Sequence, residues 1–113
     1  MKNVREALEA KIELMSDDQV KVLDQILAEY NRAVAKFPEW PNRILDAVAV
    51  LQEEVGELQK EALHTVYEPD KVESDTSLFD EGVQAAAMAF RFLLSVSKYD
   101  TCPSRMHDQN IGS

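Results

Sequence analysis

The chain has 113 residues, of which 45% are hydrophobic and 29% charged, and its formal net charge at pH 7 is −9. This length suits one domain with a modest core, and the negative charge without any basic run argues against a nucleic-acid partner. No stretch has the length and apolar character of a membrane span or a signal peptide, and the single Cys102 excludes an internal disulfide, so we expect a cytoplasmic protein without a membrane partner.

Two helices are predicted in the N-terminal third of the chain. The first covers residues 2–14, because Val4, Leu8 and Ile12 recur at helical spacing. Ser16 and Gln19 then have the spacing of a capping box, which opens a second helix that runs to about residue 36. We expect the second helix to bury its apolar residues, which are Leu23, Ile26, Leu27, Tyr30, Val34 and Phe37.

A third helix is predicted over residues 42–66, after a segment that two prolines interrupt. Pro41 is expected in its first turn, where the missing N–H group of proline is harmless. Steps of three and four separate its apolar residues, so one face of the helix should meet the core. The residues of this face are Ile44, Val48, Leu51, Val55, Leu58 and Ala62.

A fourth helix is predicted over residues 75–98, after a polar connector around Pro69, with Ser74 or Asp75 as its cap. Residues 83–96 are apolar on nearly every side, which is typical of a segment surrounded by protein. Four short helices can hardly cover such a segment, so we expect a homodimer or homotetramer. The sequence thus predicts an all-α helical bundle of about four helices in one domain, residues 1–100, followed by a flexible tail, residues 101–113.

Acidic residues gather on one side of the third helix. Glu54, Glu57 and Glu61 share a face at about 100° per residue, with Glu53 further round. Like charges at this spacing repel each other, so either water screens them or something positive binds there.

On the fourth helix a polar ribbon follows an otherwise apolar surface, and its residues are Glu81, Gln84, Arg91 and Ser95. If the two helices pack antiparallel, as their short connector favours, their carboxylates could form a cage of oxygen ligands for Mg²⁺ or Mn²⁺. The alternative is a solvated acidic surface.

These two motifs resemble those of the MazG-like all-α nucleoside triphosphate pyrophosphohydrolases. That family carries Glu-x-x-Glu on one helix and Glu-x-x-Asp on the next, which are matched here by Glu54-Val-Gly-Glu57 and Glu81-Gly-Val-Gln84. The similarity runs from about residue 40 to residue 98 and is strongest in EEVGEL. Gln84 departs from the family pattern, because it is neutral where the family has an aspartate.

The resemblance implies a Mg²⁺-dependent enzyme that hydrolyses a nucleoside triphosphate, often a deoxynucleotide, between its α and β phosphates. Glu54, Glu57 and Glu81 would hold the metal ion with Gln84 completing the site. Either Glu53 or Glu61 would orient or deprotonate the attacking water.

Four further residues are candidates for substrate binding, and each has a structural alternative. Trp40 either stacks on the base or plugs the core. His64 and Tyr67 line the same pocket or lie on the surface. Arg91 either grips the triphosphate or pairs with an acid across a subunit interface.

Two other functions compete with this interpretation. One is hydrolysis of phosphoribosyl-ATP, which is an activity of the same superfamily. The other is a non-catalytic helical oligomerisation module with an acidic face. The glycines are scattered and no glycine-rich phosphate loop is present, which argues against nucleotide binding by that kind of loop.

Overall fold

Four α-helices make up the part of the chain that the structure, a computed structural model, describes, residues 3–72 and 77–101. They are α1 (Val4–Glu13), α2 (Asp17–Lys36), α3 (Ile44–Tyr67) and α4 (Ser77–Leu94). Single turns of 3₁₀ helix follow at η1 (Pro69–Lys71) and η2 (Val96–Lys98). These residues form no β-strand, although an isolated parallel bridge joins Arg43 to Asp100. The predicted all-α class with four helices is confirmed.

The starts of the first two helices follow from their caps. The side chain of Asn3 accepts a hydrogen bond from the backbone N–H of Glu6 at 2.8 Å. Ser16 and Gln19 form the predicted capping box: Ser16 Oγ accepts from the Gln19 N–H at 3.2 Å, and Gln19 Oε1 accepts from the Ser16 N–H at 2.8 Å. Each bond satisfies a backbone donor that has no partner within the helix.

Two predicted boundaries are wrong. Pro41 does not lie in the first turn of α3, because Arg43 caps that helix in an extended conformation and Pro41 precedes the cap. The fourth helix ends at Leu94 rather than at residue 98, since Ser95 leaves the helical conformation and a 3₁₀ turn follows. The backbone N–H of Asp100 then donates to the carbonyl oxygen of Asn42 at 2.9 Å, so the chain turns back toward the start of α3.

Three expectations fall outside the described residues. Lys2, at the start of the first predicted helix, is one of them. The proposed caps Ser74 and Asp75 are another, and residues 102–113 of the predicted tail are the third.

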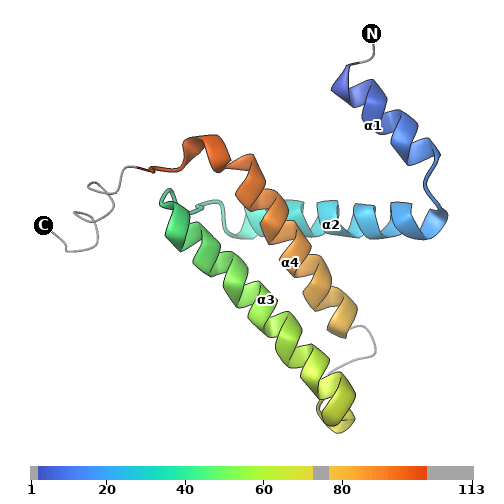
Figure 1. Cartoon of the computed structure of the whole chain (residues 1–113), viewed down its shortest axis with the longest axis vertical. Helices are drawn as coiled ribbons and strands as arrows, with labels where there is room; N and C mark the ends of the chain where they lie inside the picture. The colour runs from blue at the N-terminus through green and yellow to red at the C-terminus, as the bar shows by residue number, and fades with distance from the viewer. Residues whose placement is uncertain (1–2, 73–76, 102–113) are drawn as a thin grey trace, which may run out of the picture.

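The helices pack around α4. α3 and α4 lie against each other and run in opposite directions, while α2 crosses α4 (Figure 1). Ala33, Ala87 and Met88 form the centre of the core, and the small alanine side chains let the helices approach closely. Beside them the rings of Tyr30 and Phe90 meet edge to face, with centroids 5.0 Å apart and an angle of 89° between the rings.

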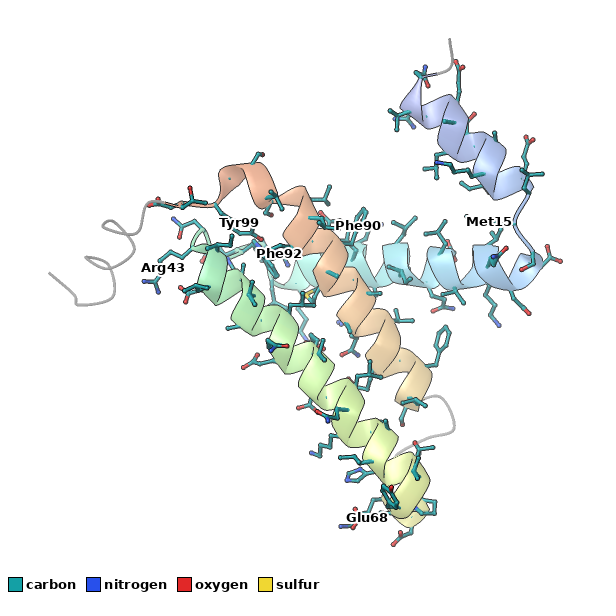
Figure 2. All side chains as sticks on the ribbon, viewed as in Figure 1. Met15, Arg43, Glu68, Phe90, Phe92 and Tyr99 are labelled. Carbon is teal, nitrogen blue, oxygen red and sulfur yellow. The ribbon has the colours of Figure 1, made fainter. Side chains whose placement is uncertain are left out.

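The C-terminal end of α4 is tied to the segment before α3. Arg91 is buried; its Nη2 donates to the carbonyl oxygen of Phe37 at 2.8 Å, and its guanidinium carbon lies 4.9 Å from the ring centroid of Trp40. Trp40 Nε1 donates to the hydroxyl of Tyr99 at 2.8 Å, and that hydroxyl donates to the carbonyl oxygen of Phe92 at 3.2 Å. Figure 2 shows Phe92 and Tyr99 next to each other, where their ring centroids are 5.2 Å apart.

Much of the predicted apolar surface is not covered within one chain. Phe37 is 60% exposed and Leu27 is 39% exposed, so the expectation that both are buried is wrong for the single chain. Leu93, in the segment expected to be surrounded by protein, is 68% exposed. Among the described residues no bulky side chain is fully buried. The radius of gyration is 17.7 Å, against about 13 Å for a compact chain of this length.

α1 contributes most to this open shape, because it projects away from the other three helices (Figure 1). Met15 marks the corner between α1 and α2, well away from α3 (Figure 2). None of the helices in the described residues combines the length and the apolar character that crossing a membrane requires.

The buried alanines of this fold generate a test with a matched control. Ala47 on α3 is 0% exposed, whereas Ala49 on the same helix is exposed. Replacing Ala47 with leucine should lower the free energy of unfolding by about 1–3 kcal/mol, because the site has no room for the larger side chain. Ala49→Leu should change it by less than about 0.5 kcal/mol. Urea unfolding measures both, and equal effects would contradict the packing described for α3.

Candidate functional site

A pocket of about 300 Å³ lies between α3 and α4 and contains most of the predicted acidic residues. α3 contributes Glu57, Lys60, Glu61 and His64. α4 contributes Ser77, Asp80, Glu81 and Gln84, and η1 adds Lys71. On both helices the four residues follow the spacing i, i+3, i+4 and i+7, which places them on one face. Because the helices are antiparallel, these two faces meet.

The most informative residue of the pocket is Glu61, whose side chain the structure buries. Only 9% of the residue is exposed, and its Oε1 atom has no hydrogen-bond partner among the described residues. The Oε2 atom of Glu81, on the opposite wall, is also buried from solvent. A buried carboxylate oxygen without a partner is costly, and a bound cation or hydrogen-bond donor would remove that cost.

Glu54 does not line this pocket, although it belongs to the same acidic group. Burial raises the pKa of Glu54 above its ordinary value, and the negative charges of Glu57, Glu29 and Glu53 raise it further. Glu29 lies on α2, so a third helix contributes negative charge to the group. No local sequence pattern marks Glu29, because its place in the group depends on where α2 crosses α4.

A second hollow, of about 370 Å³, adjoins the first on the other side of α4. Glu29 and Arg32 line it from α2, and Asp80 and Gln84 line it from α4. Since Asp80 and Gln84 also line the first pocket, the two hollows share a wall. The N-terminal half of α4 therefore lies between acidic side chains from α2 and from α3.

Basic side chains border the first pocket. Lys60 and Lys71 line it together with His64. Lys71 Nζ lies 3.3 Å from Oε1 of Glu68, and His64 Nε2 lies 3.7 Å from Oε2 of the same residue. Glu68 sits at the C-terminal end of α3, as Figure 2 shows. The positive charges of Lys60 and Lys71 thus lie at the end of the pocket near the C-terminus of α3.

The other predicted site residues lie elsewhere. Trp40 and Arg91 line a separate pocket of about 340 Å³ with Tyr30, Lys98 and Tyr99. Arg91 is ten residues beyond Glu81, so the two lie about 15 Å apart along α4. Glu53 and Tyr67 are exposed, Tyr67 by 77%, and neither lines the acidic pocket.

Asp80 also lines the acidic pocket, although no motif in the sequence marks it. Asp80 precedes Glu81 by one residue and is therefore offset from it by about 100° around the helix, which by spacing alone argues against both sharing a site. The pocket is wide enough for both neighbours to line it, and their shared spacing with Ser77 and Gln84 was the available signal. Lys71 had no such signal, since it belongs to the connector after α3.

The donor atoms of the pocket suit a hard cation, but their present arrangement does not encircle one. In residues 3–72 and 77–101, no three histidine, cysteine or acidic side chains converge closely enough to hold a metal ion. Carboxylate and amide oxygens are nevertheless the ligands that Mg²⁺ prefers, and the unpartnered Oε1 of Glu61 fits such a ligand. The chemistry of these donor atoms therefore suits Mg²⁺, although the described side chains do not converge on one point.

Comparison of the chain with protein-family models, with curated proteins and with solved structures gives no match.

Repulsion within the acidic group gives a stability test on the metal-free protein. The pKa of Glu54 is raised in the folded state, so ionisation of Glu54 lowers the free energy of unfolding. This loss develops as the pH rises from the pKa of Glu54 in the unfolded chain through its pKa in the folded protein. Glu57→Gln should raise the free energy of unfolding at pH 7 by a few tenths of a kcal/mol, roughly the value of one like-charge pair on a helix. The gain should shrink as the pH falls to about 4, where ordinary glutamates take up protons.

Urea unfolding in the presence of a metal chelator measures this gain at both pH values. Glu9→Gln, which neutralises an exposed glutamate on α1, is the control and should show no comparable gain. A loss of stability at pH 7 in Glu57→Gln would contradict the repulsion.

Proposed function

We propose that this chain is a cytoplasmic Mg²⁺-dependent nucleoside triphosphate pyrophosphohydrolase, of the kind that the MazG-like motifs suggest. The observation that carries the proposal is the pocket between α3 and α4, whose lining includes two lysines together with Glu61 and Glu81, each of which has a buried carboxylate oxygen. Hydrolysis of a phosphoanhydride needs acidic side chains that hold a cation and positively charged side chains that contact the phosphate oxygens.

The residues that would hold the ion come from both helices. Glu57 and Glu81 line the pocket, Gln84 can add a neutral amide oxygen, and Glu54 stands one turn before Glu57. Glu61, which was predicted as a candidate for catalysis, is also close enough to share this task because it lines the same pocket. A bound Mg²⁺ would neutralise phosphate charge and position the attacking water.

The chain's own groups account for the rest of the reaction. Water adds across the bond between the α and β phosphates, so that the monophosphate and pyrophosphate separate, and a carboxylate accepts the proton of that water. Of the two candidate bases we assign this role to Glu61, since it is buried in the pocket, whereas Glu53 is exposed outside it. Lys60 and Lys71 would attract the phosphate oxygens to the pocket.

For recognition of the base we retain His64, which lines the acidic pocket. Trp40 and Arg91 lie in the other pocket of the same chain and Tyr67 is exposed, so these three would act on a nucleotide only from a neighbouring copy. That requirement connects catalysis to the assembly proposed below.

A screen for pyrophosphate release tests the enzyme. With Mg²⁺ and the full set of ribo- and deoxynucleoside triphosphates, the protein should release pyrophosphate from at least one. Glu54→Gln and Glu57→Gln should each lower that rate by on the order of 100-fold or more, because several kcal/mol of stabilisation come from the metal ion. Glu9→Gln on α1 should leave the rate unchanged.

Undiminished turnover in both variants would exclude this mechanism. Release only from phosphoribosyl-ATP, included in the same screen, would favour the second enzymatic activity. If no substrate releases pyrophosphate and calorimetry shows no saturable binding of Mg²⁺ or Mn²⁺, the chain is a non-catalytic module instead.

We further propose that the protein works as a homodimer or homotetramer. The exposed apolar residues of α1 and α4 support this, because Val4 is 86% exposed, Leu8 49% and Leu93 68%. An open chain with a radius of gyration of 17.7 Å leaves too little apolar surface covered for a stable monomer. A second copy of the same chain offers matching apolar faces.

The mass of the protein in solution tests the assembly. Light scattering after size-exclusion chromatography should give two or four times the chain mass of 12.8 kDa. Leu93→Glu should shift the protein toward the monomer, because a charge buried in an interface is costly. Ala35→Glu, which adds the same charge at an exposed position of α2, should keep the wild-type mass. A monomeric wild-type protein would contradict the assembly.

A further inference from the structure

We propose that Arg32 of α2 binds a phosphate group of the nucleotide, from the side of α4 opposite the two lysines. This inference rests on the proposed function and adds a residue outside the stretch that resembles the known family. It commits Arg32, a residue that no sequence motif marked, to direct contact with the substrate.

The position of Arg32 is the first reason. It lines the hollow between α2 and α4 together with Asp80 and Gln84, and these two residues also line the acidic pocket. Arg32 therefore lies in a hollow that adjoins the acidic pocket along Asp80 and Gln84, next to the place where the polyphosphate of a bound nucleotide would lie.

The geometry of Arg32 is the second reason. Its Nε and Nη2 atoms donate to the two carboxylate oxygens of Glu29, at 3.0 and 2.6 Å. The side chain of Glu29 is only 17% exposed, whereas that of Arg32 is 56% exposed. One edge of the guanidinium is thus anchored on a largely covered carboxylate, while the edge that carries Nη1 is left for another acceptor. Such a fork matches two oxygens of a phosphate.

The charge around Arg32 is the third reason. The chain carries a net charge of −9, so a triphosphate needs local positive charge to approach it. Arg91, the arginine that the sequence suggested for this task, is 6% exposed and donates to the carbonyl of Phe37.

Two opposite effects on binding distinguish this role from that of a structural ion pair. Removing the positive charge of Arg32 should weaken binding of phosphates. It should leave the affinity for Mg²⁺ alone unchanged or increase it, because the acids nearby then lose a competing cation. An arginine that only supports the fold would weaken both when it is lost.

The test is calorimetry on the full chain with two probes. One is MgCl₂ alone, and the other is the set of α,β-methylene deoxynucleoside triphosphates in excess Mg²⁺, of which the tightest binder is used. Arg32→Gln should bind the analogue about 10- to 100-fold more weakly than the wild type, as expected for the loss of a charge-assisted hydrogen bond. The affinity of Arg32→Lys for the analogue should lie between those of Arg32→Gln and the wild type, because lysine keeps the positive charge but not the forked guanidinium.

Arg5→Gln is the matched control, since it removes the same charge from an exposed position on α1. Equal affinity of Arg32→Gln and Arg5→Gln for the analogue would overturn the inference and leave the proposed enzyme intact. Equal weakening of Mg²⁺ and analogue binding in Arg32→Gln would also overturn it. If the wild-type protein binds none of the analogues, the proposed function fails and the inference falls with it.

Discussion

The antiparallel packing of α3 against α4 is the contact on which the rest of the structure depends. It brings together two helical faces that have the same spacing of polar residues, and it does so without a large apolar core. Ala47 and Ala87 are both fully buried, so the helices can approach closely without bulky side chains between them. The pocket that Glu61 and Glu81 both line lies between the same two helices.

The two ends of this helix pair have different chemistry. At one end Arg91, Trp40 and Tyr99 satisfy one another and the neighbouring backbone, which fixes the segment before α3. At the other end like charges gather and a buried carboxylate oxygen has no partner among the described residues. The first end stabilises the fold, while the second costs stability, and such a cost is a common property of functional sites.

The uncovered apolar surface and the acidic pocket are connected through the proposed assembly. A single chain covers α4 on the sides of α2 and α3 but leaves Leu93 and Leu94 largely exposed. α1 extends away from the other helices with its apolar residues exposed, which suits contact with another copy. Such a partner could also bring an aromatic side chain, which the acidic pocket of one chain does not obtain from Trp40.

Arg32 and Glu29 extend the same logic to α2. A pair at positions i and i+3 on a helix surface is usually a local ion pair of small energetic value. Here the glutamate of the pair is largely covered and lies within electrostatic reach of Glu54, so the pair belongs to the acidic group. The helices α2, α3 and α4 therefore each contribute charged side chains to one region.

Sequence patterns alone determined the helices of this protein, because capping and the spacing of apolar residues are local properties. The box at Ser16 and Gln19 and the acidic group on the third helix could be predicted, but Val48 and Val55 of the face predicted to meet the core are 37% and 43% exposed. The start of α3 and the end of α4 could not, since the chain after α4 turns back to the segment before α3, where the N–H of Asp100 donates to the carbonyl oxygen of Asn42. Only the tertiary structure decided which polar residues share a pocket: it joined Asp80 and Lys71 to Glu61, brought Glu29 near Glu54, and separated Arg91 from them. These pairings depend on how helices distant in the chain cross, and spacing within one helix carries no information about that crossing.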